Sequence, residues 1–143
     1  MNNLMNVFRI SGSAMTAQSI RLNTTASNLA NVDSIVDETG QAYRAKHVVF
    51  EAAPLSANPT DWMNSAARGV RVQQIVESTA PGRMVFDPKN PAANEDGYVE
   101  FPNVDVVEEM ANLISASRSY QSNVEVLNTT KSLILQTIQI GQS

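Results

Sequence analysis

The fold is decided by the C-terminal residues 105–140, DVVEEMANLISASRSYQSNVEVLNTTKSLILQTIQI. No Pro or Gly interrupts this stretch before Gly141, so it predicts a single helix roughly 50 Å long. Asp105 followed by Glu108 resembles a capping box, and both acids suit the positive end of the helix dipole. Positions at alternating steps of four and three form a coiled-coil seam. The members of this seam are Val106, Met110, Leu113, Ser117, Tyr120, Val124, Leu127, Lys131, Ile134 and Ile138.

A second apolar row runs beside this seam through Val107, Ile114 and Leu135. The stripe is therefore wider than a two-stranded coiled coil needs, which predicts contacts on more than one side of the helix. The middle of the chain is too short to cover a helix of this length. The alternative is an intramolecular helical hairpin and nothing else.

Residues 2–31 predict the other long helix, because they contain no Pro and one Gly. Their seam consists of Met5, Phe8, Gly12, Met15, Ser19, Leu22, Ala26 and Leu29. Many other positions are Ser, Thr or Asn, which are poor formers of helix interiors. Ordering the backbone costs roughly 1–2 kcal/mol for each of about thirty residues. Burial of five large apolar side chains returns only about 8–15 kcal/mol in total, which is less than this cost. We therefore expect this segment to be weakly ordered in isolation.

The middle region, residues 35–103, holds all six Pro and four of the six Gly. It predicts a small antiparallel β unit with a loop over residues 54–68, in which Trp62 lies. Turns are expected at Asp87-Pro and at Asn94–Gly97. The expected strands lie within residues 43–51, 69–77, 84–86 and 98–101.

The predicted fold class is mainly α with a small β-rich middle, the two terminal helices being paired as a coiled coil. The chain divides into an N-terminal axial helix (1–34), the middle region (35–103) and a C-terminal axial helix (104–143). Asn, Gln, Ser and Thr make up 45 of the 143 residues, so most polar groups are amides and hydroxyls. Such groups are buried at far lower cost than charges, which suits a protein surrounded by other protein. An ordinary domain with a neutral surface is the alternative.

Composition argues against several functional classes. The net charge of −4 disfavours nucleic acid as a partner, and no apolar run is long enough to span a membrane. The chain has no Cys and one His, and it has no glycine-rich phosphate-binding motif. His47 is expected to be a partly exposed strand residue, and the adjacent carboxylates Glu108 and Glu109 are expected to be solvated. We therefore expect no cofactor, no metal site and no enzymatic activity.

Both ends of the chain resemble a known family. Residues 11–34, SGSAMTAQSIRLNTTASNLANVDS, resemble the N-terminal signature of bacterial flagellar axial proteins. Residues 117–142, SRSYQSNVEVLNTTKSLILQTIQIGQ, resemble the matching C-terminal motif of rod, hook and junction proteins. In the middle, residues 43–51 and 86–105 resemble the proximal rod type within the flagellar basal-body rod family. Ser34 and Asn90 depart from that pattern, where Thr and His are common.

The resemblance implies a structural subunit of the proximal rod, located in the flagellar basal body where the rod crosses the periplasm. Its terminal helices would assemble into the axial tube that transmits torque. The implied partners are other copies of the chain, other flagellar rod proteins and the flagellar export apparatus. The alternative is an export-linked adaptor or junction protein that caps the axis rather than polymerising. The residues expected at the subunit interface are Met5, Phe8, Gly12, Met15, Ser19, Leu22, Asn28, Leu29, Asn31, Met110, Leu113, Tyr120, Asn123, Val124, Leu127, Ile134 and Ile138.

Weak intrinsic order of the two ends has a measurable consequence. In the isolated chain, backbone amides over residues 1–34 and 105–143 should exchange rapidly with solvent, because their helices lack the packing that neighbouring chains supply. Hydrogen exchange followed by mass spectrometry on a verified monomer measures this. Strong protection of both segments in that monomer would contradict the expectation.

Overall fold

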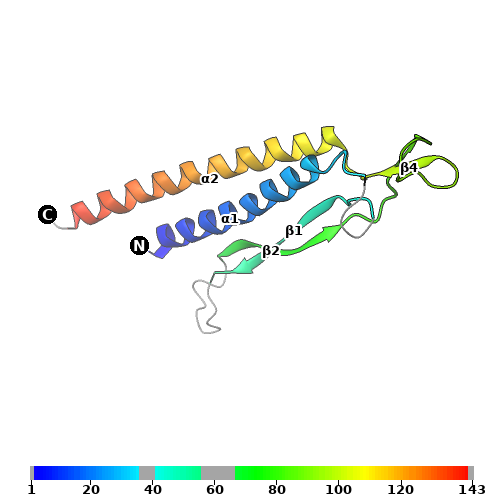
Figure 1. The fold of residues 1–143 in the computed structure, drawn as a ribbon. Coiled ribbons are helices and arrows are strands. Elements are labelled where there is room, and N and C mark those ends of the chain that lie inside the picture. The colour runs from blue at the N-terminus through cyan, green and yellow to red at the C-terminus, as the bar shows by residue number, and fades with distance from the viewer. Residues whose placement is uncertain (1, 36–40, 56–66, 142–143) are drawn as a thin grey trace. The chain divides into compact units, whose positions relative to one another are not determined.

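The computed structural model describes residues 2–35, 41–55 and 67–141. Along these residues, one long helix comes before four strands and a second long helix follows them (Figure 1). The elements are α1 (Asn2–Ala30), β1 (Lys46–Pro54), β2 (Arg68–Glu77), β3 (Arg83–Phe86), β4 (Tyr98–Phe101) and α2 (Val106–Ile140). This confirms the predicted fold class of two long terminal helices with a small β-rich middle. Trp62, in the predicted loop, lies outside the described residues.

The chain forms two compact units. Each unit contains part of both helices and part of the β-rich middle, so neither is a continuous segment of the sequence. The division into residues 1–34, 35–103 and 104–143 stays a prediction about segments of the chain. Unit 1 comprises Met1–Ile20, Val49–Gln74 and Ser115–Ser143, and unit 2 comprises Arg21–Val48 and Ile75–Ile114.

Helix α2 begins where the sequence predicts. The Asp105 carboxylate accepts hydrogen bonds from the backbone N–H groups of Val107 (2.9 Å) and Glu108 (3.1 Å). The Asp105 carbonyl accepts the first helical bond, from the N–H of Glu109 at 2.9 Å. Asp105 is therefore the N-cap, and it satisfies donors that the first turn of a helix leaves unpaired.

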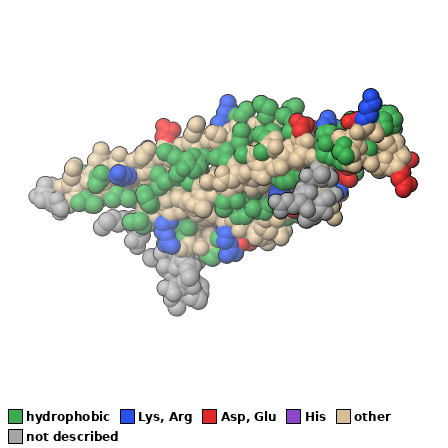
Figure 2. Space-filling view, in the orientation of Figure 1, with side chains coloured by type: hydrophobic (Ala, Val, Ile, Leu, Met, Phe, Trp, Pro, Cys, Tyr) green, Lys and Arg blue, Asp and Glu red, His purple; other side chains and the backbone are tan. Residues whose placement is uncertain are grey.

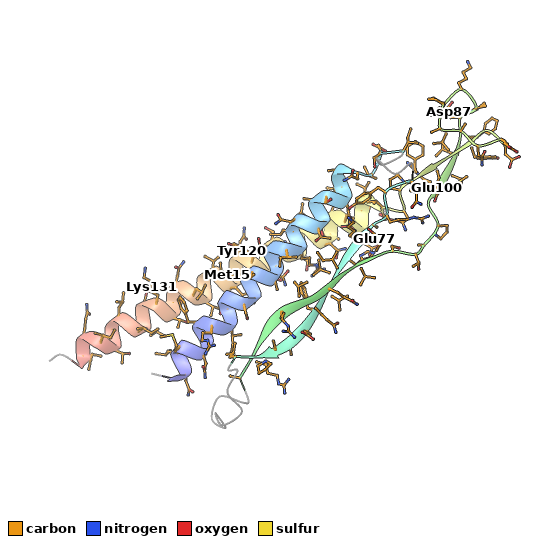
Figure 3. The ribbon with its side chains drawn as sticks, turned by 60° about the horizontal axis from the view of Figure 1, so that its bottom comes forward. Met15, Glu77, Asp87, Glu100, Tyr120 and Lys131 are labelled. Atoms are coloured by element: carbon orange, nitrogen blue, oxygen red, sulfur yellow. The ribbon has the colours of Figure 1, made fainter. Side chains whose placement is uncertain are left out.

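The buried faces of the helices consist of small and polar side chains. In unit 1, where α1 lies alongside α2, Ala17 and Ala116 are 2% and 0% exposed (Figures 1 and 3). Along α2 the side chains at Glu109, Ala116 and Thr130, spaced by multiples of seven, are all buried. This row lies one residue before the predicted row that contains Met110, Ser117, Val124 and Lys131. Small side chains let two helices approach closely, so the larger apolar ones are left farther out.

Strands β3 and β4 form an antiparallel pair in which Val85 lies opposite Val99 and Phe86 lies opposite Tyr98. Val99 is fully buried on one face of this hairpin. On the other face the rings of Phe86 and Tyr98 meet edge to face, with centroids 5.2 Å apart. Strands β1 and β2 form a separate two-stranded sheet.

The predicted turn between β3 and β4 is confirmed at Asn94–Gly97. The Asn94 side-chain oxygen accepts hydrogen bonds from the backbone N–H groups of Asp96 (3.1 Å) and Tyr98 (2.9 Å). Gly97 follows with φ of 79°, a left-handed conformation that a residue with a Cβ rarely adopts. The turn then closes through a 2.9 Å bond from Asp87 N–H to the carbonyl of Gly97.

In unit 1, strand β2 approaches α1 closely at Gly69. A Cβ added at Gly69 would lie 2.6 Å from the Ser13 hydroxyl and 2.9 Å from the side chain of Leu55. The absence of a side chain lets the Ser13 hydroxyl accept a 3.0 Å hydrogen bond from Val70 N–H. The same hydroxyl donates to the carbonyl of Ile10 within α1 at 2.7 Å. One serine thus joins the helix to the strand.

Two glycines allow a matched test of this backbone geometry. Gly97→Ala should destabilise the β3–β4 turn by about 1–2 kcal/mol, because its left-handed conformation is strained for alanine. Exchange of the Asp87 amide should then accelerate by about 5–30-fold. Gly12→Ala, in a helix and with open space around the added methyl, should instead stabilise α1 by about 0.5–1 kcal/mol. Equal effects at the two positions would contradict this account.

Candidate assembly interface

Helix α2 exposes a stripe of large apolar side chains at its start, in unit 2. Val107, Met110 and Ile114 are 78%, 52% and 53% exposed. Their spacing of three and four places them on one side of the helix. We call these three residues the apolar stripe. In unit 1, further exposed apolar side chains lie on both helices, at Met5, Phe8, Val126, Leu133, Leu135 and Ile138.

Hydrophobic side chains cover much of one face of the molecule. Figure 2 shows them there, with Lys, Arg, Asp and Glu side chains at scattered places between them. Burying one large apolar side chain contributes about 1.5–3 kcal/mol, so covering one that is half exposed contributes roughly half of that. Contiguous exposed apolar groups of this kind are typical of protein–protein contact sites.

The residues predicted for the subunit interface occupy three environments. Met5, Phe8, Ser19, Met110 and Ile138 are exposed. Gly12, Met15, Leu22, Leu29, Asn31, Leu113, Tyr120, Asn123, Val124, Leu127 and Ile134 are of intermediate exposure, and Asn28 is buried. Contacts of these residues with other copies stay a prediction, because the structure contains a single chain.

Asn28 lies at the centre of a hydrogen-bond network in unit 2. It is 0% exposed, and its side-chain oxygen accepts from Lys46 N–H and from the Tyr43 hydroxyl, both at 2.9 Å. Its amide N–H₂ donates to the Lys46 carbonyl at 2.8 Å and to the Glu109 carboxylate at 2.9 Å. The amide therefore pairs with both backbone groups of Lys46, as a neighbouring strand would. Its loss would leave the buried Glu109 carboxylate without this donor, at about 1–3 kcal/mol, and would also break the part-buried bonds to Lys46 and Tyr43.

A second asparagine, Asn103, extends this network to Ala45, the residue before Lys46. Asn103 accepts a hydrogen bond from Ala45 N–H at 2.7 Å and donates to the carbonyl of Ala80 at 2.8 Å. Arg44 donates to the same Ala80 carbonyl at 2.6 Å and pairs with Glu100 at 3.2 Å. The residues that lead into β1 are thus held from α1 on one side and from the segment before α2 on the other.

Sequence reasoning missed most of this network. Glu109 was expected to be solvated, but it is 3% exposed and accepts the Asn28 amide, so that expectation is wrong. The available signal was its position seven residues before Ala116, which places both on one helix face. The tertiary fold brings Tyr43 and Lys46 to Asn28, and it brings Asn103 to Ala45. No local sequence pattern marks these residues.

Other candidate sites carry less chemistry. A cavity of about 470 Å³ in unit 2 is lined by mixed residues that include Arg44, Tyr98 and Glu100. His47 is exposed on β1, as expected. Among residues 2–35, 41–55 and 67–141, no group of three or more His, Cys, Asp or Glu side chains is placed to hold a metal ion. Within the same residues, no helix has the length and hydropathy needed to cross a membrane.

Comparison with known proteins bears on both helices. A family model described as "Flagella basal body rod protein" matches residues 8–34, which lie mainly in α1. A second, "Flagellar basal body rod FlgEFG protein C-terminal", matches residues 95–140, which include α2. The flagellar basal-body rod protein FlgC of Yersinia enterocolitica is 58% identical over 139 residues, covering 97% of this chain and 98% of its own. The chain belongs to the FlgC family of flagellar basal-body rod proteins.

Other FlgC proteins support the same assignment. Those of Escherichia coli O6:H1 and Salmonella typhimurium are 56% and 55% identical, again over 97% of this chain and 98% of their own. The resemblance noted at both ends of the sequence is thereby confirmed. This FlgC-family chain is a structural subunit of the bacterial flagellar rod, in the part of the basal body that spans the periplasm. The names of these relatives give no support to the alternative of a capping adaptor.

Proposed function

We propose that this FlgC-family chain assembles into the rod through exposed apolar side chains of its terminal helices, and that the resulting tube transmits torque. The observation that carries the proposal is the apolar stripe of Val107, Met110 and Ile114, exposed by half or more on one side of α2. A partner helix laid on this stripe removes the apolar area from water, and this is the main favourable term in protein association.

The distribution of residue types between the two kinds of helix face supports this proposal. The faces buried within the chain use Ala17, Ala116 and Thr130, which bury little apolar area each. The larger apolar side chains of the two helices are half-buried, such as Leu22 and Leu113, or exposed, such as Met110 and Ile114. A protein that is stable as a monomer buries its largest apolar side chains in its own core. In a subunit of an assembly, such side chains can stay exposed until a neighbouring chain covers them.

The proposed partners are other copies of the chain and other rod proteins. The flagellar export apparatus is proposed as a further partner on the basis of the sequence resemblance. Weakly helical termini suit a chain that is ordered after its transport, since their stability then comes from assembly. Catalysis is not part of the proposed role, in keeping with the rod-protein names of the relatives.

A substitution in the apolar stripe tests the proposal. Ile114→Asp places a charge where a neighbouring chain is expected to pack, so the variant should enter purified basal bodies at less than a tenth of the normal level. The measurement is quantitative immunoblotting of basal bodies from a strain whose own copy is deleted. Swimming in soft agar should fall in parallel, while the cellular amount of the variant stays within about twofold of normal.

Ser115→Asp is the matched control. Ser115 is the next residue of the same helix, is also exposed, and receives the same charge on a side of α2 that lacks the stripe. It should enter basal bodies at close to the normal level. Normal incorporation of Ile114→Asp, or an equal loss for both variants, would sink the proposal that the stripe is an assembly surface.

A further inference from the structure

Two polar side-chain pairs join α1 to α2 within unit 2. Asn28 donates to the carboxylate of Glu109 at 2.9 Å, and the Arg21 guanidinium donates to the side-chain oxygen of Asn112 at 2.8 Å. Each pair has a charged member, which makes its hydrogen bond stronger than a neutral one. We call these two interactions the register pairs.

We propose that the register pairs fix the axial position of α1 against α2, and that they thereby set the alignment in which the two helices present their outer faces to a neighbouring chain. The inference rests on the proposed function, because alignment matters only if those faces meet neighbours. It assigns Asn28 and Glu109 a positioning role inside one chain, in contrast to the contact between subunits expected for Asn28 from the sequence.

The helix faces themselves specify register poorly. Buried positions recur every seven residues along each face, at Ala17 and Thr24 on α1 and at Glu109 and Ala116 on α2. A slip of seven residues, which is two turns, moves one helix by about 10.5 Å and brings the buried positions of the two faces into line again. Hydrogen bonds near 2.9 Å do not survive such a slip. Buried polar pairs are known to select register in packed helices for this reason.

Asn28 also ties this register to the β-rich middle. Besides Glu109, it holds both backbone groups of Lys46 at the start of β1. A shift of α1 would therefore separate Asn28 from the strand and from α2 at once. Full burial of Asn28 keeps water from replacing the lost partners.

The test reverses the direction of one hydrogen bond. Asn28→Asp replaces the donor with an oxygen that faces the Glu109 carboxylate, so incorporation into basal bodies should fall at least tenfold. Glu109→Gln keeps an acceptor and should incorporate within about twofold of normal. In the double variant Asn28→Asp/Glu109→Gln, the glutamine N–H₂ donates to the new carboxylate, so incorporation should recover at least threefold over Asn28→Asp alone. Asn23→Asp, the same change at an exposed position of α1, is the matched control and should behave normally.

Register is read separately by cross-linking. The chain has no Cys, so two engineered pairs at exposed positions, Ala26→Cys with Glu108→Cys and Ala26→Cys with Ala111→Cys, report how α1 lies along α2. Basal bodies are treated with a flexible bismaleimide, and the intrachain cross-linked peptides are quantified by mass spectrometry. The ratio of the two yields should change at least threefold in Asn28→Asp and return toward normal in the double variant. A purely destabilising substitution lowers the amount incorporated without changing this ratio.

An unchanged ratio in Asn28→Asp would overturn the inference, as would failure of Glu109→Gln to improve incorporation of Asn28→Asp. If Asn28→Asp yields no basal bodies, the double variant Asn28→Asp/Glu109→Gln decides. Recovery of its incorporation supports the inference, and no recovery contradicts it. Failure of the proposed function would appear in a different experiment, as normal incorporation of Ile114→Asp. It is therefore distinguishable from failure of the register inference.

Discussion

The burial of small and polar side chains on the inner faces of the two terminal helices is the feature on which the rest of the structure depends. Ala17 and Ala116 are almost completely buried in unit 1, and Asn28 and Glu109 are buried and bonded to each other in unit 2. These residues bury little apolar area, so their contribution to stability comes from close packing and satisfied hydrogen bonds rather than from the transfer of large side chains out of water.

This choice of inner residues has a functional consequence at the surface. The large side chains of Val107, Met110 and Ile114, which an ordinary domain would place in its core, remain exposed. The single chain therefore exposes apolar surface that another chain can cover. Membership of the FlgC family of rod proteins accounts for this exposure, since a subunit in a polymer is surrounded by others. The many amides and hydroxyls of the sequence suit the same environment, because they are buried at lower cost than charges.

The sequence predicted the elements well and the helix faces only in part. Both long helices, the Asp105 cap and the turn at Asn94–Gly97 depend on local chemistry, so they were readable from neighbouring residues. The inner face of α2 was not, because heptad spacing gives the period of a helix but does not say which of two adjacent rows faces inward. Met110 is the more apolar choice, yet Glu109 is the buried one, since its partner Asn28 lies 81 positions away in the chain. Such pairings arise from tertiary structure and leave no local pattern.

A map of intact basal bodies at side-chain resolution tests the central claim most directly, because it shows the same chain among its neighbours. The account predicts that the side chains of Val107, Met110 and Ile114 are covered by adjacent subunits. It also predicts that Asn28 keeps its bonds to Glu109 and Lys46 of its own chain. A map in which the stripe faces solvent, or in which Asn28 bonds to a different subunit, would contradict it.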